Sequence, residues 1–445
     1  MYNFQIGKKA VAWGFISQFF QYGITILILP VILNRLPESE MAIWYIFMSI
    51  SAVVGLVDFG FSPSLSKQVS FVFSGVNTLQ ADGVSIERTE TINYSLVNDL
   101  YKTCVKLYKN IALVIGILLL TVGSAYLFVA VKNVVVNIIV SWLLFVGSLV
   151  YNFYFNYILV FIGGRGLVKE NNRLIIISKT IYVISLFVLI YSGLGLLSLV
   201  IANFLSTFVF RFLGKRIAFD DDLEKSLSSF TEYNDLTPVI WHNAKRYGVT
   251  NLGVVLLSHS SVFLSGLFLS LSDVAQLGLT VQIFSIICVM SRVVLSTFAP
   301  KFSSLFVQND LKQIRYLFVK SQICAYFIFF ICTIGVVLFG NFILINIIHS
   351  NVLLPDKHLL FLYMFFYFME ITHGNCVTLI STENKVPFYK ASIVSGVISI
   401  IVTLILLVNN VGIYSFPIGL ICGSLPYNSW KWPLVVYKML WKNGE

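Results

Sequence analysis

Residues 111–131 read IALVIGILLLTVGSAYLFVAV and contain no charged side chain. After Lys132, a second charge-free run continues to Gly164. A helix needs about 20 apolar residues to cross the hydrocarbon core of a bilayer. This stretch therefore predicts one membrane span, a tight turn and a returning span. Both spans are expected to be α-helices, because hydrocarbon offers no water to the backbone polar groups.

The rest of the chain has the same character. Of its 445 residues, 58% are hydrophobic and 11% are charged, whereas soluble proteins are about a quarter charged. We therefore predict an all-α polytopic membrane protein with about 12 transmembrane helices. The predicted spans cover residues 11–34, 41–65, 111–131, most of 134–164, 174–191, 196–212, 247–271, 274–299, 321–345, 359–381, 391–408 and 413–429.

The distribution of Lys and Arg predicts the topology. With the N-terminus inside, the inner segments hold 26 of the 30 basic residues, and the outer turns hold only Arg35, Lys132 and Lys357. Cytoplasmic loops are enriched in Lys and Arg, so both termini are predicted to be cytoplasmic. The net charge of +10 then reflects membrane orientation, and no nucleic-acid partner is expected. The first apolar run exceeds a signal peptide in length and predicts an uncleaved span.

A long polar segment, residues 214–246, divides the predicted spans into six and six. We predict an N-terminal six-helix lobe over 1–213, a cytoplasmic inter-lobe linker over 214–246 and a C-terminal six-helix lobe over 247–429. Transporters use such repeats. Residues 430–445 mix Trp and Leu with Lys, which predicts a cytoplasmic interfacial amphipathic tail.

The sequence lacks several common catalytic motifs, and its one short candidate motif has a simpler interpretation. The chain has no G-x-x-x-x-G-K-[ST], HExxH or GxSxG motif, and its outer turns leave little room for a catalytic domain, so we predict that it is not an enzyme. Residues 220–222 are three aspartates. They could hold a metal and a nucleotide sugar, but a solvated linker is the favoured interpretation. The six cysteines are scattered, and neither a metal site nor a cofactor is expected.

Charged residues within spans cost about 2.5 to 3.5 kcal/mol each, so they mark functional candidates. Arg292, in the eighth span, could hold a phosphate or carboxylate with its forked guanidinium, or extend to the inner headgroups. Glu370 and His373 are three residues apart and can share one helix side. That pair could bind and release a proton, or could form a structural hydrogen bond.

Other polar residues at membrane depth complete the candidate set. Asp58, near the inner end of the second span, could pair with Arg292 or bond to a helix end. Gln18, Gln21 and His259 could contact substrate or form interhelical hydrogen bonds. We thus expect substrate binding by Arg292, Gln18, Gln21 and His259, and ion coupling or gating by Asp58, Glu370 and His373.

Three segments carry a family resemblance. Residues 55–68, GLVDFGFSPSLSKQ, resemble the O-antigen flippases of the Wzx type, as do residues 273–278, DVAQLG, and residues 300–303, PKFS. These flippases form part of the polysaccharide-transport branch of the multidrug/oligosaccharidyl-lipid/polysaccharide exporter superfamily. The topology extends the resemblance over the whole chain.

The resemblance implies two six-helix lobes around a central cavity. It implies transfer of undecaprenyl-diphosphate-linked O-antigen oligosaccharide repeat units from the inner to the outer leaflet of the bacterial inner membrane by alternating access. Implied partners are the lipid-linked oligosaccharide, membrane lipids, a polysaccharide polymerase and a chain-length regulator. Related lipid II flippases carry several Arg in the first lobe's cavity. The first span here has Gln18 and Gln21 but no Arg before Arg35, which argues against lipid II.

An alternative of the same fold is a cation-coupled small-molecule or drug antiporter. It would need acids in its cavity, and Asp58 and Glu370 could serve. A membrane glycosyltransferase is disfavoured by the short outer turns.

Overall fold

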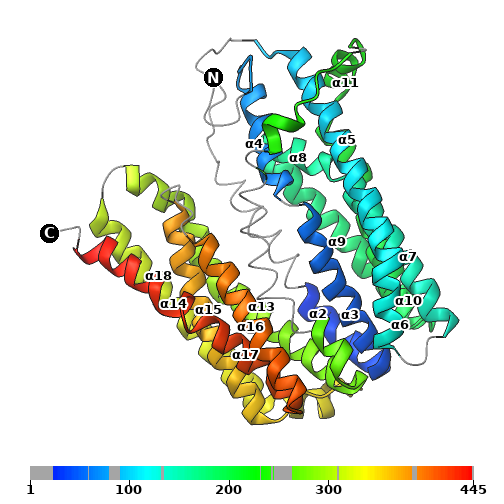
Figure 1. Cartoon of the computed structure of the whole chain (residues 1–445), viewed down its shortest axis with the longest axis vertical. Helices are drawn as coiled ribbons and strands as arrows, with labels where there is room; N and C mark the ends of the chain where they lie inside the picture. Colours follow the sequence, from blue (N-terminus) through cyan, green and yellow to red (C-terminus); the bar gives the residue numbers. More distant parts are fainter. Residues whose placement is uncertain are drawn as a thin grey trace. The chain divides into compact units, whose positions relative to one another are not determined.

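The computed structural model describes residues 24–58, 60–79, 91–131, 135–230, 232–241, 244, 263–307, 310–382 and 388–442. The regular elements in these ranges are helices, with no β-strand (Figure 1). The chain divides into two compact units. The first comprises residues 1–36 and 50–251, and the second comprises residues 37–49 and 252–445.

The helices that lie wholly or partly in the first unit follow the predicted spans. They are α2 (Ile24–Arg35), α3 (Glu38–Val54), η2 (Gly55–Asp58), α4 (Phe61–Phe73), α5 (Tyr94–Leu118), η3 (Leu119–Gly123), α6 (Ser124–Ala130), α7 (Val136–Tyr154), α8 (Tyr157–Gly164), α9 (Val168–Tyr191), α10 (Leu196–Ala218) and α11 (Asp221–Ser228). The predicted spans 174–191 and 196–212 leave four residues between them, and these form a tight turn between α9 and α10 in which Gly193 and Gly195 adopt positive φ, at 83° and 53°. These two helices then pack along one another.

The second unit contains the first part of α3 together with a second set of helices. These are α13 (Leu271–Val307), α14 (Leu311–Ile343), η4 (Leu344–Ile348), α15 (Lys357–Thr382), α16 (Tyr389–Val408), η5 (Gly412–Tyr414), α17 (Ser415–Ser424), α18 (Asn428–Tyr437) and η6 (Lys438–Lys442). Tyr45 of α3 donates a hydrogen bond to Gln282 Oε1 of α13 at 2.7 Å.

Eight helical stretches in the described residues are long and apolar enough to cross a membrane: Glu38–Asp58, Tyr94–Ala130, Val136–Gly164, Val168–Tyr191, Leu196–Ala218, Leu271–Ser296, Leu311–Ile348 and Lys390–Val408. The prediction of an all-α polytopic membrane protein is confirmed. Most of the predicted first and seventh spans lies outside the described residues.

Large apolar side chains are exposed along the outer helices. Ile117 of α5 and Phe327 of α14 are 63% and 67% exposed. In water such a surface would cause aggregation. In a bilayer it contacts the hydrocarbon chains, so it identifies the lipid-facing sides of these two helices.

The predicted tail begins inside a helix of the second unit. Trp432 and Val436 of α18, with Leu440 of η6, are buried in a core cluster that includes Leu295 and Phe302 of α13. The opposite side of α18 exposes Trp430, Leu434 and Tyr437. One side of the segment therefore belongs to the unit's core, and its placement at the inner headgroups remains a prediction.

The described part of the predicted linker is docked on the first unit. Asp99 of α5 accepts hydrogen bonds from the Asn234 amide at 3.0 Å and from the Asn234 side chain at 3.3 Å. Lys106, two turns along α5, pairs with Asp235 at 2.6 Å. Residues 232–236 are thereby held against α5 on the polar side of this helix.

Asp220, the first of the three aspartates, has a structural role. Its carboxylate accepts from the Leu223 amide at 3.1 Å and so caps α11. It also pairs with Arg165 at 2.8 Å, and that hydrogen bond lowers the pKa of Asp220. These contacts use the oxygens that a metal would need, which agrees with the favoured linker interpretation.

The docked linker should respond to acid. The hydrogen bond from Lys106 Nζ, followed by those from Thr237, lowers the pKa of Asp235 to about 2. The ordinary Asp value is about 3.9. Because the pKa of Asp235 is lower in the folded state, the ionised Asp235 stabilises the docked linker fully above about pH 4. This stabilisation is lost as the pH falls through about 2. In the Lys106→Gln variant, Asp235 lacks its Lys partner, so the linker should lose this stabilisation at a higher pH than in wild type. Pepsin digestion of the full chain between pH 2 and 4 should show earlier cleavage within 232–241.

The control for this experiment is Lys215→Gln, which removes one exposed charge from the end of α10. It should leave the pepsin pattern unchanged. Equal cleavage of wild type and Lys106→Gln at every pH would show that the Lys106–Asp235 pair does not hold the linker on α5.

The close approach of α4 and α8 depends on glycine. A Cβ at Gly164 would lie 2.4 Å from Val69 Cβ and 2.7 Å from the Ser66 carbonyl oxygen. Such distances require one helix to move, because a backbone atom cannot rotate away. The sequence therefore permits this contact only because Gly164 has no side chain.

We expect Gly164→Ala to destabilise the protein by about 1–3 kcal/mol, as overpacking does, and a thermal unfolding measurement in detergent would show it. The matched control is Gly335→Ala in α14, where a Cβ would meet no atom within 4 Å. This control should be neutral or stabilising by up to about 1 kcal/mol. Equal midpoints for the two variants would show that α4 and α8 are not held this closely.

Candidate functional site

Two broken helices meet in the first unit. The chain leaves η2 at Asp58 and restarts as α4 after Gly60, whose φ of 76° is left-handed. The helix from Val136 is interrupted at Phe155 and Asn156 before α8 begins. Discontinuous helices at membrane depth leave backbone groups that need other partners, and the two breaks here are joined by side chains.

Asp58 closes the first break. Its Oδ2 accepts from the Ser62 amide at 3.1 Å, and its Oδ1 accepts from the Ser62 hydroxyl at 2.9 Å and from the Tyr108 hydroxyl at 3.2 Å. Asp58 thus bonds to the start of α4, the arrangement that the helix-end interpretation of the sequence describes. In the described part of the chain, no basic side chain lies within ion-pair distance of Asp58.

Arg211 of α10 is a buried positive charge near the second helix break. Its side chain is buried, at 3% exposure. Nε and Nη2 donate to Asn152 Oδ1 at 3.1 and 2.7 Å, and Nη2 also donates to Asn156 Oδ1 at 3.0 Å. Nη1 is buried without a hydrogen-bond partner in the described structure. A buried Arg with no adjacent carboxylate is costly, so its position requires a compensating interaction.

A hydrogen-bond chain with a defined direction supplies that interaction. Arg211 has only donors, which fixes the Asn156 oxygen toward it and turns the Asn156 amide group toward Ser62, where Nδ2 donates to Oγ at 2.8 Å. Ser62 can then direct its own hydrogen toward Asp58, which only accepts when ionised. The chain therefore runs from a cation to an anion through two neutral side chains. We refer to Asp58, Ser62, Tyr108, Asn156 and Arg211 as the Asp58 cluster.

The sequence did not identify Arg211 as a site residue. It stands at the end of the predicted span 196–212 and is one of the 26 basic residues that the topology prediction places in inner segments, whereas the helix continues to Ala218 and Arg211 is buried. Lys179 is also one of the 26 basic residues that the topology prediction places in inner segments. It lies near the middle of α9, about 17 Å from either helix end at 1.5 Å per residue, with its Nζ over the Tyr182 ring at 5.6 Å.

The second unit brings three predicted residues together. Arg292 of α13 lies against α15, where a Cβ added to Gly374 would be 2.5 Å from its Cζ. Its Nη2 donates to Thr378 Oγ1 at a long 3.4 Å. Glu370 Oε2 is 3.6 Å from His373 Nδ1 on the same helix, as the spacing of three predicts, and Glu370 lies within electrostatic range of Arg292. We refer to Arg292, Glu370, His373 and Thr378 as the Arg292 cluster.

Several polar atoms around this cluster are buried without a hydrogen-bond partner in the described structure. They include both ring nitrogens of His373 and Oδ1 of Asn375. Native proteins leave few such atoms, and each one needs an explanation such as a bound ion, water or ligand. The polar half of α15 is therefore a place where a polar ligand could bind.

Three predicted site residues lie outside the described residues: Gln18, Gln21 and His259. Their assigned role in substrate binding stays a prediction. Within the described part, no group of three or more His, Cys, Asp or Glu side chains could hold a metal ion.

Comparisons with solved structures identify the fold. An inward-facing multidrug resistance MATE family transporter of the MOP superfamily aligns with 98% of this chain and 100% of its own, at 13% identity and a TM-score of 0.66. The chain has a MATE-like transporter fold. The lipid II flippase MurJ, in an inward closed conformation, aligns with 96% of this chain and 87% of its own, at 14% identity and a TM-score of 0.64.

A MATE transporter from Vibrio cholerae aligns with 99% of this chain and 96% of its own, at 16% identity and a TM-score of 0.58. No family model and no curated protein matches the sequence. The fold similarity thus extends over nearly the whole chain, although few residues are shared.

The hydrogen-bond chain predicts energetic coupling between Asp58 and Arg211. Asp58→Asn and Arg211→Gln should each destabilise the protein, by about 3–5 kcal/mol, because each leaves one buried charge uncompensated. The double variant should lose clearly less than the two single losses together. Thermal unfolding of the four proteins in detergent measures this double-mutant cycle.

A control cycle pairs Asp58→Asn with Arg216→Gln, since Arg216 is an exposed residue of α10 whose guanidinium lies over Phe212. Those effects should add to within about 0.5 kcal/mol. If the Asp58 and Arg211 effects add equally well, the two charges are not linked.

Proposed function

We propose that this protein is a flippase of the bacterial inner membrane. It moves undecaprenyl-diphosphate-linked O-antigen oligosaccharide repeat units from the inner to the outer leaflet by alternating access. Both termini are cytoplasmic in this proposal. A polysaccharide polymerase and a chain-length regulator are its expected partners. The fold supports this proposal, because similar solved structures include both multidrug transporters and a lipid II flippase.

The observation that carries the proposal is the state of Arg292. Only the long hydrogen bond to Thr378 and the nearby Cys288 thiol engage its guanidinium in the described structure, and no described carboxylate is within ion-pair distance. A guanidinium at membrane depth is costly. Its forked donors match a diphosphate, which is the charged part of the proposed substrate.

Glu370 and His373 give the same site a means of release. The Glu370 carboxylate lies within electrostatic range of the Arg292 guanidinium, so it competes with a bound phosphate for the positive charge. Protonation of the Glu370–His373 pair would weaken that competition, and deprotonation would restore it. Ion coupling through this pair would give the transport cycle a direction, since each step would follow the proton.

The Asp58 cluster is the proposed gating element of the first unit. It connects the break between η2 and α4 to the break between α7 and α8. Changes in the ionisation of Asp58 would alter the hydrogen bonds that hold both breaks, because Ser62 and Asn156 lie between the two charges. Such a cluster can bias the conformation of the helices around it without contacting substrate.

The alternative function is export of cationic small molecules by a cation-coupled antiporter of the same fold. Glu370 favours it, because its side chain is 28% exposed and could meet a cation. Asp58 argues against it, because three donors already occupy its oxygens. Arg292 also repels a cationic substrate from the site that holds Glu370.

The decisive experiment is deletion of the gene in its native host, followed by complementation. Wild type should restore surface polysaccharide. Arg292→Ala should reduce it by about 10- to 100-fold, as expected for the loss of one charge-assisted hydrogen bond of about 1.5–3 kcal/mol. Arg292→Lys should keep part of the transport, because the charge remains while the fork is lost. Undecaprenyl-linked oligosaccharide should accumulate on the inner leaflet of cells that carry the Ala variant.

Arg216→Ala is the matched control and should complement fully. Normal polysaccharide in Arg292→Ala cells would remove the proposed role of this residue. Normal polysaccharide in the deletion strain, together with a changed drug-resistance profile, would assign the antiporter function instead.

A further inference from the structure

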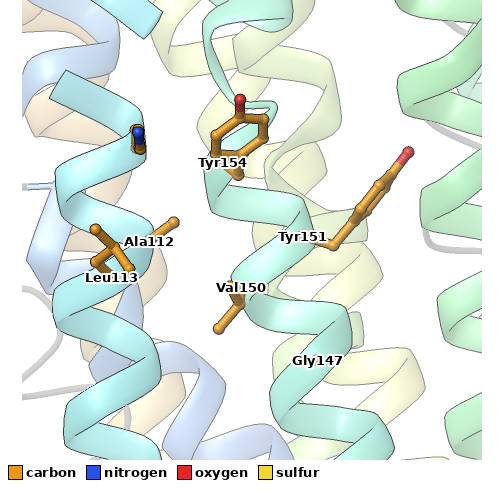
Figure 2. A pocket seen from close by; sticks show the side chains of 7 residues that line it. Ala112, Leu113, Gly147, Val150, Tyr151 and Tyr154 are labelled. Atoms are coloured by element: carbon orange, nitrogen blue, oxygen red, sulfur yellow. The ribbon is translucent and has the colours of Figure 1, made fainter. Parts of the chain in front are cut away.

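The first unit has a groove on its surface between α5 and α7 (Figure 2). Its volume is about 380 Å³. Ala112 and Gly147 make it hollow, since a Cβ at Gly147 would meet no atom within 4 Å. Val150 and Tyr154 of α7 line the rest of one wall, and Leu113 of α5 lines the other.

The groove lies on a side of the unit that faces lipid. Leu113 is 56% exposed. The same helices also expose Val114, Ile117, Leu143 and Leu144. Large apolar side chains can be exposed in a membrane-spanning segment only where hydrocarbon covers them, so hydrocarbon chains should also fill the groove.

Lys109 gives one end of the groove a positive charge. It is the last charged residue before the apolar run 111–131, so it stands where the bilayer core begins. Lys106, one turn earlier, is neutralised by Asp235. Lys109 has no such partner among the described carboxylates. A Lys can lay its methylene stem along an apolar surface and keep its ammonium at the interface.

Tyr154 adds a hydrogen-bond donor. Both Tyr154 and Tyr151 of α7 line the groove, but the Tyr151 side chain points away from α5 (Figure 2) and its ring packs on Phe204 and Phe208 of α10. The Tyr154 hydroxyl is not hydrogen-bonded to another described group. Tyr side chains are enriched at the membrane interface, where the ring contacts hydrocarbon and the hydroxyl contacts headgroups. A phosphate at this level could therefore receive a charge from Lys109 and a hydrogen bond from a tyrosine.

We infer that this groove is a binding site for an anionic glycerophospholipid of the inner leaflet. The phosphate binds Lys109 and a tyrosine hydroxyl, and one acyl chain lies over Gly147. The length of the groove fits a lipid of one leaflet. Gly147 to Tyr154 corresponds to about 10 Å of helix. That length fits within the half-thickness of the hydrocarbon core, about 15 Å, whereas a polyprenyl carrier is much longer. The site is independent of the proposed transport activity.

Native mass spectrometry of the full-length protein, released from nanodiscs, tests the site. With dioleoyl phosphatidylglycerol, one bound lipid should be retained by a smaller fraction of Lys109→Gln molecules than of wild-type molecules. The apparent affinity should fall about fivefold, which is the conversion of about 1 kcal/mol per interfacial Lys. Gly147→Leu should displace the same lipid by filling the groove. Phosphatidylcholine should bind wild type and Lys109→Gln equally.

The control is Lys312→Gln, which removes an exposed charge at the start of α14 in the second unit. It should retain the lipid. Three results would overturn the inference: equal losses in Lys109→Gln and Lys312→Gln, unchanged retention in Gly147→Leu, or displacement of the lipid by a polyprenyl phosphate at equimolar amounts. Thermal midpoints within a few degrees of wild type would show that the variants remain folded.

Discussion

In hydrocarbon, every polar group of a protein must find its partner within the protein. This constraint governs how the chain uses its few charges. The helices hydrogen-bond their own backbone groups, and the exposed apolar side chains of α5 and α14 contact the lipid. What remains are the side chains that break the apolar pattern and the places where helices are interrupted. In the first unit these two exceptions coincide, because Asp58 and Asn156 stand at the two breaks.

The two polar clusters solve the problem differently. In the Asp58 cluster, neutral Ser62 and Asn156 separate the charges, and their hydrogen bonds all run in one direction, so the group is nearly complete without a ligand. In the Arg292 cluster, the guanidinium makes one long side-chain hydrogen bond to Thr378, and neither His373 ring nitrogen has a hydrogen-bond partner in the described structure. The first arrangement suits an element that holds conformation. The second suits a site that accepts and releases something charged.

Local features were predictable from the sequence, and long-range ones were not. Charge-free runs located the spans and the short gap at residues 192–195, and the spacing of three placed Glu370 beside His373. The break at Asn156 gave no signal, because it lies inside a charge-free run. Arg211 was assigned to the inner segment because basic residues follow it closely. Its burial depends on Asn152 and Asn156, which are more than 50 positions away in sequence. Pairings at that distance are set by tertiary packing, which a single sequence does not show.

The geometry of α5 has a mechanical consequence. Asp99, Thr103 and Lys106 hold the docked linker, whereas Tyr108 bonds to the Asp58 cluster. From Asp99 to Tyr108 is about two and a half helical turns, so these contacts lie on opposite sides of the same rod. A rotation of α5 about its own axis would therefore disturb both sets of contacts together. The docked linker on one side of this helix and the Asp58 cluster on the other would thus both oppose such a rotation.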